Sequence, residues 1–405
     1  MTDKAPRGLA FLLAAMTAIA PFSIDTYLPA FPEMGTSLGA TPIEVQQTLA
    51  IYMAAFAFMM LWHGALADAL GRKRVLLVAF AIYVAASLVC VFAASIEVLW
   101  FGRMLQGMSA GAGMVLSRAI IRDLLEGPAA QRMIAHTGMI FAIAPAIAPV
   151  IGGWIHAFFG WHAIFIFLAC YGVALFAAVH FLLPETLPPE RRQSLHPGPL
   201  ARAYFEVFTH PPFLALALTV ALSFNGFFIY VVSAPKFLLE HVGVSERGFL
   251  WLFGPAMLGL MGGNWLSAHL AGQVSSRRTI GLGFAIMIAA AIVNLALNLW
   301  LPPTLPWAVL PQAVYLFGVA VAMPVLTLRI LDLFPDRRGL ISSCQGATQT
   351  GMNAITAAVL APMFWDTTLS LATSMVLFLA VGLAAFSFRR FGGNGSRGRR
   401  QAGSG

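Results

Sequence analysis

The most regular feature of the chain is a series of apolar runs separated by short polar segments. Each run is about 20 residues long, the length of an α-helix that crosses the hydrocarbon core of a bilayer, and none shows barrel-type alternation. Twelve runs are found, at residues 9–30, 43–66, 74–94, 98–121, 133–156, 162–183, 212–234, 248–270, 278–299, 306–330, 343–364 and 369–390. The pattern predicts an all-α membrane protein with twelve transmembrane helices.

The runs form two sets of six, because the longest polar stretch, rich in Pro, Arg and Glu, separates the sixth from the seventh. Near the end of the first run lie Tyr27 and Pro32, and Tyr230 and Pro235 repeat them in the seventh at an offset of 203 residues. Two pseudo-symmetric halves would place a substrate site between them. We predict an N-terminal six-helix half at 1–183, a cytoplasmic linker at 184–211, a C-terminal six-helix half at 212–391 and a disordered cytoplasmic tail at 392–405.

The composition indicates that the chain is surrounded by lipid, and the distribution of charge predicts how it is oriented in the membrane. The chain is 59% hydrophobic and 10% charged, with a mean hydropathy of +0.82. The formal net charge of +8 comes from short basic clusters between apolar runs, not from a stripe with interleaved aromatics, so nucleic acid is not an expected partner. These clusters share one side of the predicted topology, and only Lys236 and Arg247 lie on the other. The positive-inside rule predicts a multi-pass protein with both termini in the cytoplasm.

Sequence patterns of enzymes and metal sites are not found. The three cysteines, Cys90, Cys170 and Cys344, fall inside apolar runs without metal-ligand spacing. The chain has no Walker glycine loop, nucleophile elbow or paired-carboxylate constellation. We therefore expect neither an enzyme nor a bound metal or cofactor, and we expect the proton gradient to be the energy source.

Asp25 is the one carboxylate well inside a predicted span, where a charged side chain costs roughly 2.5 to 3.5 kcal/mol. A site that is alternately dry, wet or occupied by substrate could release and rebind a proton there. Arg103 is predicted at the same depth, in the outer third of the fourth span, and an unpaired arginine would be equally costly. We predict Asp25 and Arg103 as a proton-coupling pair; a static ion pair that fixes helix packing is the alternative.

The loop after the second run carries a distinctive motif, Gly64-Ala-Leu-Ala-Asp-Ala-Leu-Gly-Arg-Lys-Arg74. Small residues in it allow close helix approach, and its charges can form a latch at the cytoplasmic helix ends. An ordinary positive loop would explain the basic cluster but not the aspartate or the glycines. The predicted latch consists of Gly64, Asp68, Gly71, Arg72, Arg122 and Asp123.

This motif resembles the G-x-L-A-D-x-x-G-R-K signature of the major facilitator superfamily, and two further elements extend the resemblance. Arg103-Met-Leu-Gln-Gly107 resembles the superfamily's R-x-x-Q-G element. The fifth run resembles the proline and glycine pattern of its antiporters, and such a helix is expected to kink and to pack closely, unless the pattern is only structural. The residues of this antiporter helix are Pro145, Pro149, Gly152 and Gly153.

Three other segments are similar to the Bcr/CflA group of drug-resistance transporters: Ser23–Ala30, Ser117–Asp123 and Leu183–Leu187. The resemblance implies a proton-coupled antiporter of a bacterial inner membrane that works by alternating access. It would export small amphipathic drugs of the phenicol or bicyclomycin type. The expected partners are the drug, protons and the lipid bilayer, and a monomer is expected.

A promiscuous drug site needs adaptable apolar contacts and a few orienting hydrogen bonds. The substrate-binding candidates are Tyr27, Tyr52, Phe56, Asn225, Tyr230, Gln345, Gln349 and Asn353. The last three recur every four residues and so form one polar stripe, which equally fits hydrogen bonding between helices. Two alternative functions stay open: a transporter of a metabolite such as a sugar, amino acid or siderophore, and a membrane channel or sensor.

Overall fold

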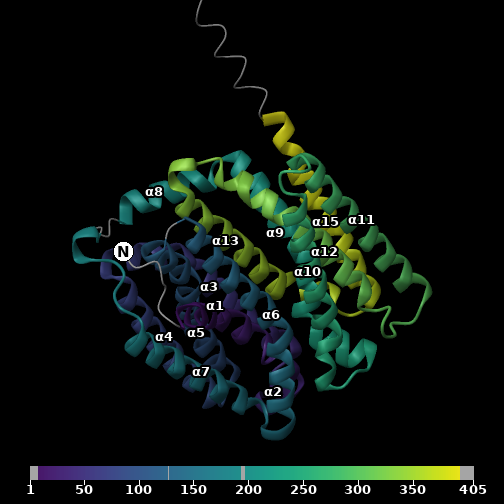
Figure 1. Ribbon diagram of the computed structural model, residues 1–405. Coiled ribbons are helices and arrows are strands. Elements are labelled where there is room, and N and C mark those ends of the chain that lie inside the picture. Colours follow the sequence, from purple (N-terminus) through teal and green to yellow (C-terminus); the bar gives the residue numbers. More distant parts are fainter. Residues whose placement is uncertain (1–7, 126, 193–196, 393–405) are drawn as a thin grey trace, which may run out of the picture.

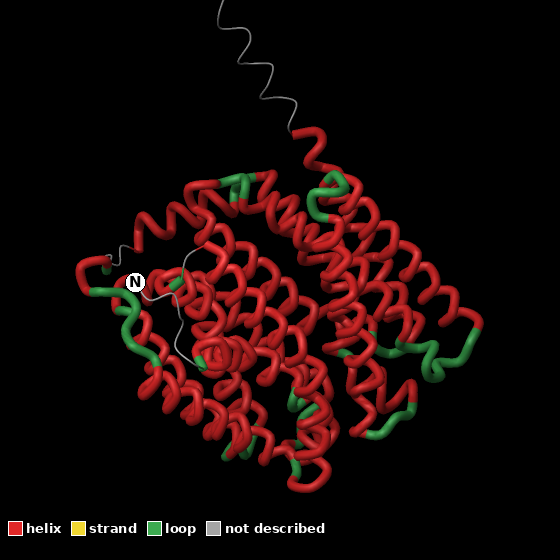
Figure 2. The backbone as a smooth tube through the Cα atoms, viewed as in Figure 1, coloured by secondary structure: helices red, strands yellow, loops and turns green. Residues whose placement is uncertain are grey.

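The computed structural model describes residues 8–125, 127–192 and 197–392, and within these ranges the chain forms helices, turns and loops but no β-strand (Figure 2). The predicted all-α class is confirmed. The predicted tail lies outside the described residues, apart from Gly392.

Six long helices form the first group, and their ends fall within a few residues of the predicted runs. Pro42 begins the second of them with the side chain of Thr41 as its cap, because the Thr41 hydroxyl accepts from the Glu44 N–H at 3.3 Å and the Glu44 carboxylate accepts from the Thr41 N–H at 2.7 Å. The helices are α1 (Leu9–Asp25), α3 (Pro42–Leu70), α4 (Arg72–Val91), α5 (Ile96–Leu124), α6 (Gly127–Phe159) and α7 (Trp161–Leu182). A 3₁₀ turn, η1 (Leu28–Ala30), and α2 (Phe31–Leu38) extend α1.

The second group repeats this arrangement with six more helices. They are α9 (Pro211–Val232), α10 (Leu250–Leu270), α11 (Ser276–Trp300), α12 (Leu310–Leu331), α13 (Arg338–Ile355) and α15 (Thr368–Gly392). Shorter elements connect or extend them: η3 (Pro235–Val242), η4 (Glu246–Phe249), η5 (Pro335–Arg337), η6 (Thr356–Leu360) and α14 (Ala361–Phe364). Between the groups lie η2 (Pro189–Arg191) and α8 (Pro197–Phe208), so part of the predicted linker is helical.

Among the described residues, nine helices are both long and apolar enough to cross a membrane. The helices that fall short are α5, α6 and α13. In α5 the buried polar residues Arg103 and Gln106 lower the hydropathy, and α13 is rich in Ser, Thr, Gln and Asn. Polar groups of α5 and α13 find protein partners instead of lipid, as where Gln106 bonds Ser87 and Gln345 bonds Thr327. In α6, Ile143–Phe159 is a shorter apolar stretch.

The two groups lie side by side in Figure 1, the first in purple to teal and the second in green to yellow. They meet along two seams, where α3 packs on α13 and α6 packs on α10. We call the end of the bundle that carries α8 and the starts of α1 and α4 the α8 face, and the opposite end, which carries α2, the α2 face (Figure 1).

Helix α8 lies on the α8 face and is tied to both groups. The Tyr204 hydroxyl donates a hydrogen bond to the Leu61 carbonyl of α3. Two residues later Glu206 pairs with Arg337 of η5 at 2.8 Å. Burial raises the pKa of Tyr204 to about 12, so its hydroxyl remains a donor throughout the physiological range. The helix therefore links the two groups non-covalently as well as through the chain.

Candidate functional site

Helix α1 breaks in the middle of its span, at Asp25. Pro29 has no N–H group with which to bond the Asp25 carbonyl, so the α-helix cannot continue, and the chain turns through Thr26 and Tyr27 into η1. The side chain of Asp25 is only 4% exposed, and its Oδ1 atom has no hydrogen-bond partner in the described part of the chain. The break thus holds a buried carboxyl group that is not fully satisfied.

Arg103 of α5 is completely buried close to this break. Its guanidinium donates to the Ser23 carbonyl at 2.9 Å and to the Gln106 side chain at 2.7 Å. Two aromatic rings enclose it, with the guanidinium carbon 4.3 Å from the centre of the Tyr27 ring and 4.4 Å from that of Tyr52. Cation–π attraction and these hydrogen bonds offset part of the desolvation of the charge.

The direct ion pair predicted between Asp25 and Arg103 is not formed. Arg103 instead bonds the backbone of Ser23, two residues before Asp25, and its Nε atom has no partner among the described residues. The stacking of the guanidinium between the two tyrosines directs its NH₂ groups to Ser23 and Gln106. The predicted depth of Asp25 also needs correction: the first span continues to Leu38, so Asp25 lies near mid-span and not in the outer third.

Further polar residues lie around Arg103: Gln106 and Ser23 belong to motifs of the sequence but were assigned no role, and Tyr83 and Ser87 were not singled out. The Gln106 amide donates to the Ser87 hydroxyl at 2.8 Å, and the hydroxyls of Ser23 and Tyr83 lie 2.6 Å apart. Tyr83 and Ser87 are polar side chains of α4 that face the core. Their position inside an apolar run is the feature of the sequence that could have identified them. Together these groups form a buried polar network that joins α1, α4 and α5.

Close helix packing surrounds the break. A Cβ atom on Gly152 of α6 would overlap the Thr26 carbonyl oxygen, and Cβ atoms on Gly107 and Gly113 of α5 would overlap the carbonyl oxygens of Tyr52 and Met16. The antiporter pattern on α6 therefore places Gly152 directly against the residue after Asp25. Pro149 and Gly153 are buried on the same helix, and Pro145 is half-buried.

The predicted substrate-binding residues in the second group bond mainly to one another. The Asn225 amide donates to Asn353 at 2.9 Å, and Gln349 donates to the same oxygen at 3.3 Å. Gln345 donates to Thr327 of α12 at 2.9 Å. In this conformation the polar stripe on α13 makes the helix-to-helix contacts of the alternative interpretation.

Tyr230 is enclosed within the second group. Its hydroxyl accepts from the Asn294 amide at 2.8 Å, and its ring packs edge-on against Phe237. Asn294 and Gln312, which lie 3.4 Å apart, were not anticipated. The neutral network here is the counterpart of the one around Tyr27, but it contains no arginine.

Two cavities lie between the groups, one toward each face. The α8-side cavity has a volume of about 680 Å³ and is lined by residues of α3, α5, α8 and α13 and by Arg72 of α4. The α2-side cavity has a volume of about 290 Å³ and is lined by residues that include Phe31, Gln46, Lys236 and Trp365.

Contacts between α3 and the α13–η6 segment form a layer between the two cavities, and the predicted substrate-binding residues line neither cavity. Met60 of α3 contacts Thr350 of α13 on one side of this layer, and Gln47 donates to the Ala358 carbonyl at 2.9 Å on the other. Tyr52 and Phe56 lie between these two contacts along α3, and both are buried. This stretch of α3 is therefore packed against the second group between the two cavities.

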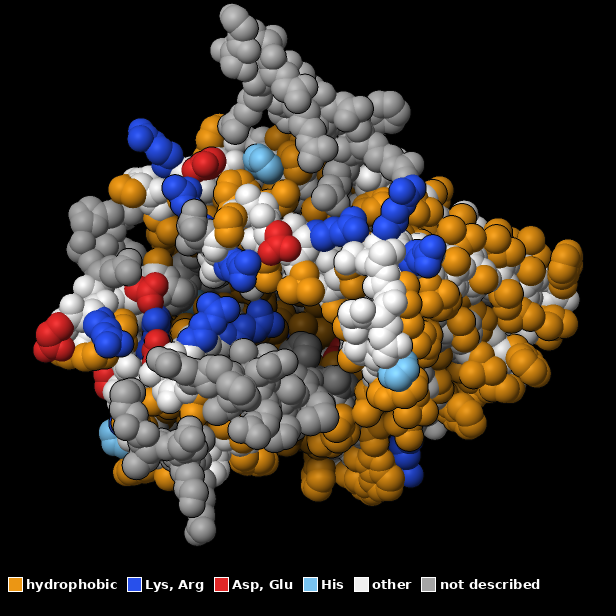
Figure 3. Space-filling model, turned by 45° about the horizontal axis from the view of Figure 1, so that its top comes forward, with side chains coloured by type: hydrophobic (Ala, Val, Ile, Leu, Met, Phe, Trp, Pro, Cys, Tyr) orange, Lys and Arg blue, Asp and Glu red, His pale blue; other side chains and the backbone are white. Residues whose placement is uncertain are grey.

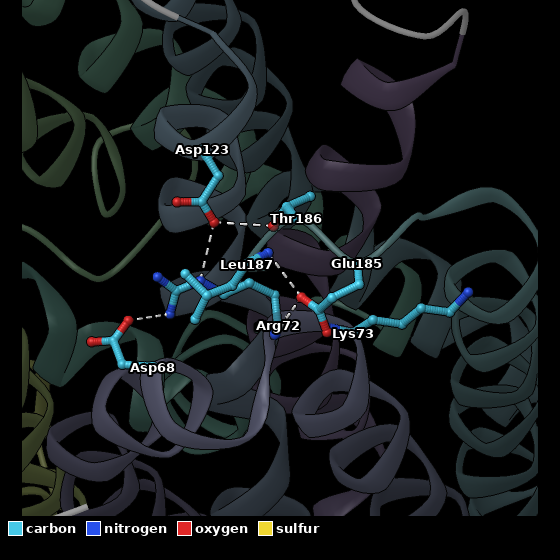
Figure 4. A network of polar contacts seen from close by, with 7 residues as sticks. All are labelled: Asp68, Arg72, Lys73, Asp123, Glu185, Thr186 and Leu187. Atoms are coloured by element: carbon cyan, nitrogen blue, oxygen red, sulfur yellow. Dashed lines mark hydrogen bonds and ion pairs between the residues drawn. The ribbon is translucent and has the colours of Figure 1, made fainter. Parts of the chain in front are cut away.

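The predicted latch forms at the α8 face, with Arg72 at its centre (Figure 4). Arg72 pairs with Asp68 at 2.6 Å and with Asp123 at 3.1 Å. Gly71 adopts the left-handed region, with φ of 97°, in the tight turn between α3 and α4. Three helices are joined by one guanidinium.

Two members of the predicted latch lie elsewhere. Arg122 is exposed in the α8-side cavity, because it is one position, or about 100° of helix rotation, away from Asp123. Gly64 also lines the cavity, and a Cβ atom there would lie 4.0 Å from Val115, so this glycine does not mark a close helix contact.

Glu185, in the segment after α7, completes the latch in a role that was not predicted. Its carboxylate accepts from the backbone N–H groups of Arg72 at 2.9 Å and Lys73 at 3.3 Å, at the N-terminus of α4 (Figure 4). The neighbouring Thr186 donates to Asp123 at 3.0 Å. A carboxylate at this position satisfies orphan donors and complements the helix dipole. The Leu183–Leu187 segment therefore acts as a helix cap.

Replacing this cap should destabilise the fold. We expect Glu185→Ala to lower the free energy of unfolding by about 1–2 kcal/mol, as loss of a helix cap does. Thermal unfolding of the purified chain in detergent micelles would measure the change. Glu190→Ala is the matched control, because Glu190 is exposed in η2 of the same segment. Equal unfolding temperatures for the two variants would contradict the capping role.

Comparisons with known proteins agree with this architecture. The sequence profile described as Major Facilitator Superfamily matches residues 13–357. A protein named bicyclomycin resistance protein homolog, from Haemophilus influenzae, is 27% identical over 93% of this chain and 94% of its own length. A chloramphenicol resistance protein from Pseudomonas aeruginosa is 29% identical over 84% of this chain and 81% of its own. The solved structure of the peptide transporter POT in complex with alafosfalin superposes with a TM-score of 0.74 at 16% identity, over 96% of both chains.

Proposed function

The chain belongs to the major facilitator superfamily of membrane transporters, and from this premise we propose that it is a proton-coupled antiporter that exports small amphipathic drugs. Its relatedness to drug-resistance efflux proteins supports export. Phenicols and bicyclomycin are the first compounds to test, since relatives are named for resistance to them. We place the protein in a bacterial inner membrane, as a monomer.

One observation carries the coupling mechanism: a buried carboxyl group with an unsatisfied oxygen lies at the break in α1. In a dry site the protonated form of Asp25 is favoured, whereas water entering from either cavity would favour the ionised form. The positive charge of Arg103, which bonds the Ser23 carbonyl two residues before Asp25, would favour the ionised form of Asp25. The static-pair alternative loses support, since no direct pair is formed.

In this mechanism the proton and the drug exchange at the layer of contacts between α3 and the α13–η6 segment. Rocking of the two groups about the α3–α13 and α6–α10 seams would open the layer to one cavity at a time. Tyr52, Phe56 and Asn353 would then become accessible, and drug binding would displace the proton from Asp25. The Arg72 latch and α8 restrict how far the α8 face opens.

Charge gives the proposed orientation. Basic residues concentrate at the α8 face, as at Arg72, Lys73 and Arg337, whereas Lys236 and Arg247 lie toward the α2 face. We therefore assign the α8 face, and with it both termini, to the cytoplasm. The proposed halves are residues 1–183 and 212–391, joined by the linker at 184–211.

Transport of a metabolite by the same proton-coupled mechanism is the second candidate, because the neutral amide groups of Asn225, Gln349 and Asn353 suit a polar compound. A channel or sensor is disfavoured, because the family consists of transporters.

Accumulation of labelled chloramphenicol in inverted membrane vesicles tests the proposal. Vesicles that contain the chain should accumulate the compound when their interior is acidic, and a protonophore should abolish the accumulation. A panel should include bicyclomycin, a sugar and an amino acid. Gradient-dependent uptake of only a metabolite would favour the second candidate, and gradient-independent equilibration of every compound would contradict antiport.

A further inference from the structure

The α8-side cavity carries a positive charge that the latch does not use. Arg118 and Arg122 are one helical turn apart on α5, so both face the cavity. Arg118 reaches the Ser342 hydroxyl of the other group at 3.5 Å, and neither arginine has an acidic partner in the described part of the chain. The two aspartates of the lining, Asp68 and Asp123, are already paired with Arg72.

The opposite wall offers no compensating carboxylate. Helix α13 contributes Gly339, Leu340, Ser342 and Ser343 to the lining, all of them neutral. The lining residues that the structure describes include three arginines and two aspartates, so their net charge is +1. Figure 3 shows Lys and Arg side chains gathered around the hollow that opens on this face. A cleft of one charge sign between low-dielectric walls concentrates ions of the opposite sign.

Deeper in the cavity the lining becomes apolar. Met114 and Val115 precede Arg118 by one turn of α5, and Met60 and Leu61 face them from α3. Arg118 therefore lies at the boundary between an apolar floor and a polar mouth. This arrangement suits a molecule with an apolar body and an anionic group at one end, because methionine side chains adapt to varied shapes and a guanidinium binds carboxylate or sulfonate by paired hydrogen bonds.

We propose that the α8-side cavity is a capture site for amphipathic organic anions. Arg118 binds the anionic group, and Arg122 adds to the positive potential that attracts it. The inference rests on the proposed function, in which compounds enter from this face, and it extends the substrate class from neutral phenicols to amphipathic acids. The α8-side cavity would then select compounds by their charge before they reach Asp25.

Equilibrium binding to the purified full-length chain tests this without a proton gradient. The probes are dansylglycine, which is anionic at neutral pH, and dansylglycine amide, which is its neutral counterpart. We expect the acid to bind about tenfold more tightly than the amide, the factor that one charge-assisted hydrogen bond supplies, and to lose this advantage in high salt. Arg118→Gln should weaken binding of the acid about tenfold and leave the amide unchanged, and Arg118→Lys should restore part of the affinity.

Arg191→Gln is the matched control, because Arg191 is exposed on the same face outside the cavity lining. Three outcomes would overturn the proposal: equal affinities of acid and amide for the wild type, binding of neither, or equal loss for both probes in Arg118→Gln. Failure of proton-driven export in vesicles with the binding preference intact would instead reject only the proposed function.

Discussion

The Asp25→Asn variant is expected to lose proton-driven accumulation of substrate entirely while it still folds and binds the compound. Asparagine has nearly the shape of aspartic acid, and it can replace the protonated form that a dry site favours, so the α1 break and its packing should persist. It cannot release a proton, however, so the proton gradient can no longer drive transport. Accumulation of labelled chloramphenicol in inverted vesicles, with and without an acidic interior, would measure the loss.

The control for this prediction is Asp366→Asn. Asp366 is an exposed carboxylate whose pair with Lys236, at 3.1 Å, lies toward the α2 face. Removing such an exposed pair should cost at most about 1 kcal/mol and leave transport unchanged. Undiminished gradient-driven uptake by Asp25→Asn would remove Asp25 from the mechanism.

The Gly152→Ala variant is expected to lose both stability and transport. A single methyl group on Gly152 would overlap the Thr26 carbonyl oxygen, which belongs to the backbone and cannot turn aside as a side chain could. Helix α6 would have to move away from α1, at a cost of about 3 kcal/mol or more, at the upper end of overpacking effects. Thermal unfolding in detergent and the vesicle assay would report the two losses.

Gly351→Ala provides the matched comparison, since Gly351 is also inside a helix but a methyl group there meets no atom within 4 Å. We expect it to be neutral or mildly stabilising, because alanine has the higher helix propensity. If Gly152→Ala unfolded at the temperature of Gly351→Ala, the close approach of α6 to the α1 break would be refuted.

Much of the fold was predictable because the residues of each spanning helix are by themselves enough to identify it. Length and hydropathy identify a span such as α4 without knowledge of its neighbours, and Thr41 followed by Pro42 is a local sequence pattern typical of the helix start found at α3. Ser245, by contrast, precedes the eighth span as a residue type that often caps helices, but it makes no side-chain cap bond, and a 3₁₀ turn precedes α10 there. Ends of helices depend on tertiary contacts that a single sequence does not reveal.

The site was predictable only in part, because it depends on which side chains face each other. Asp25 and Arg103 could be singled out by the cost of burying charge, but whether they touch depends on Tyr27 and Tyr52, which hold the guanidinium toward Ser23. The same limit applied to the latch. The charge of Glu185 was visible, but its partners, the N–H groups at the start of α4, lie more than a hundred residues earlier in the chain.

If drug and proton compete through Asp25, binding of the drug must release protons. Chloramphenicol would be added to the purified chain in weakly buffered detergent solution while the pH is recorded. We expect the wild type and Asp366→Asn to release protons in a saturable way, and Asp25→Asn to bind the compound but release none. Binding to the wild type without proton release, or equal release by Asp25→Asn, would contradict this competition.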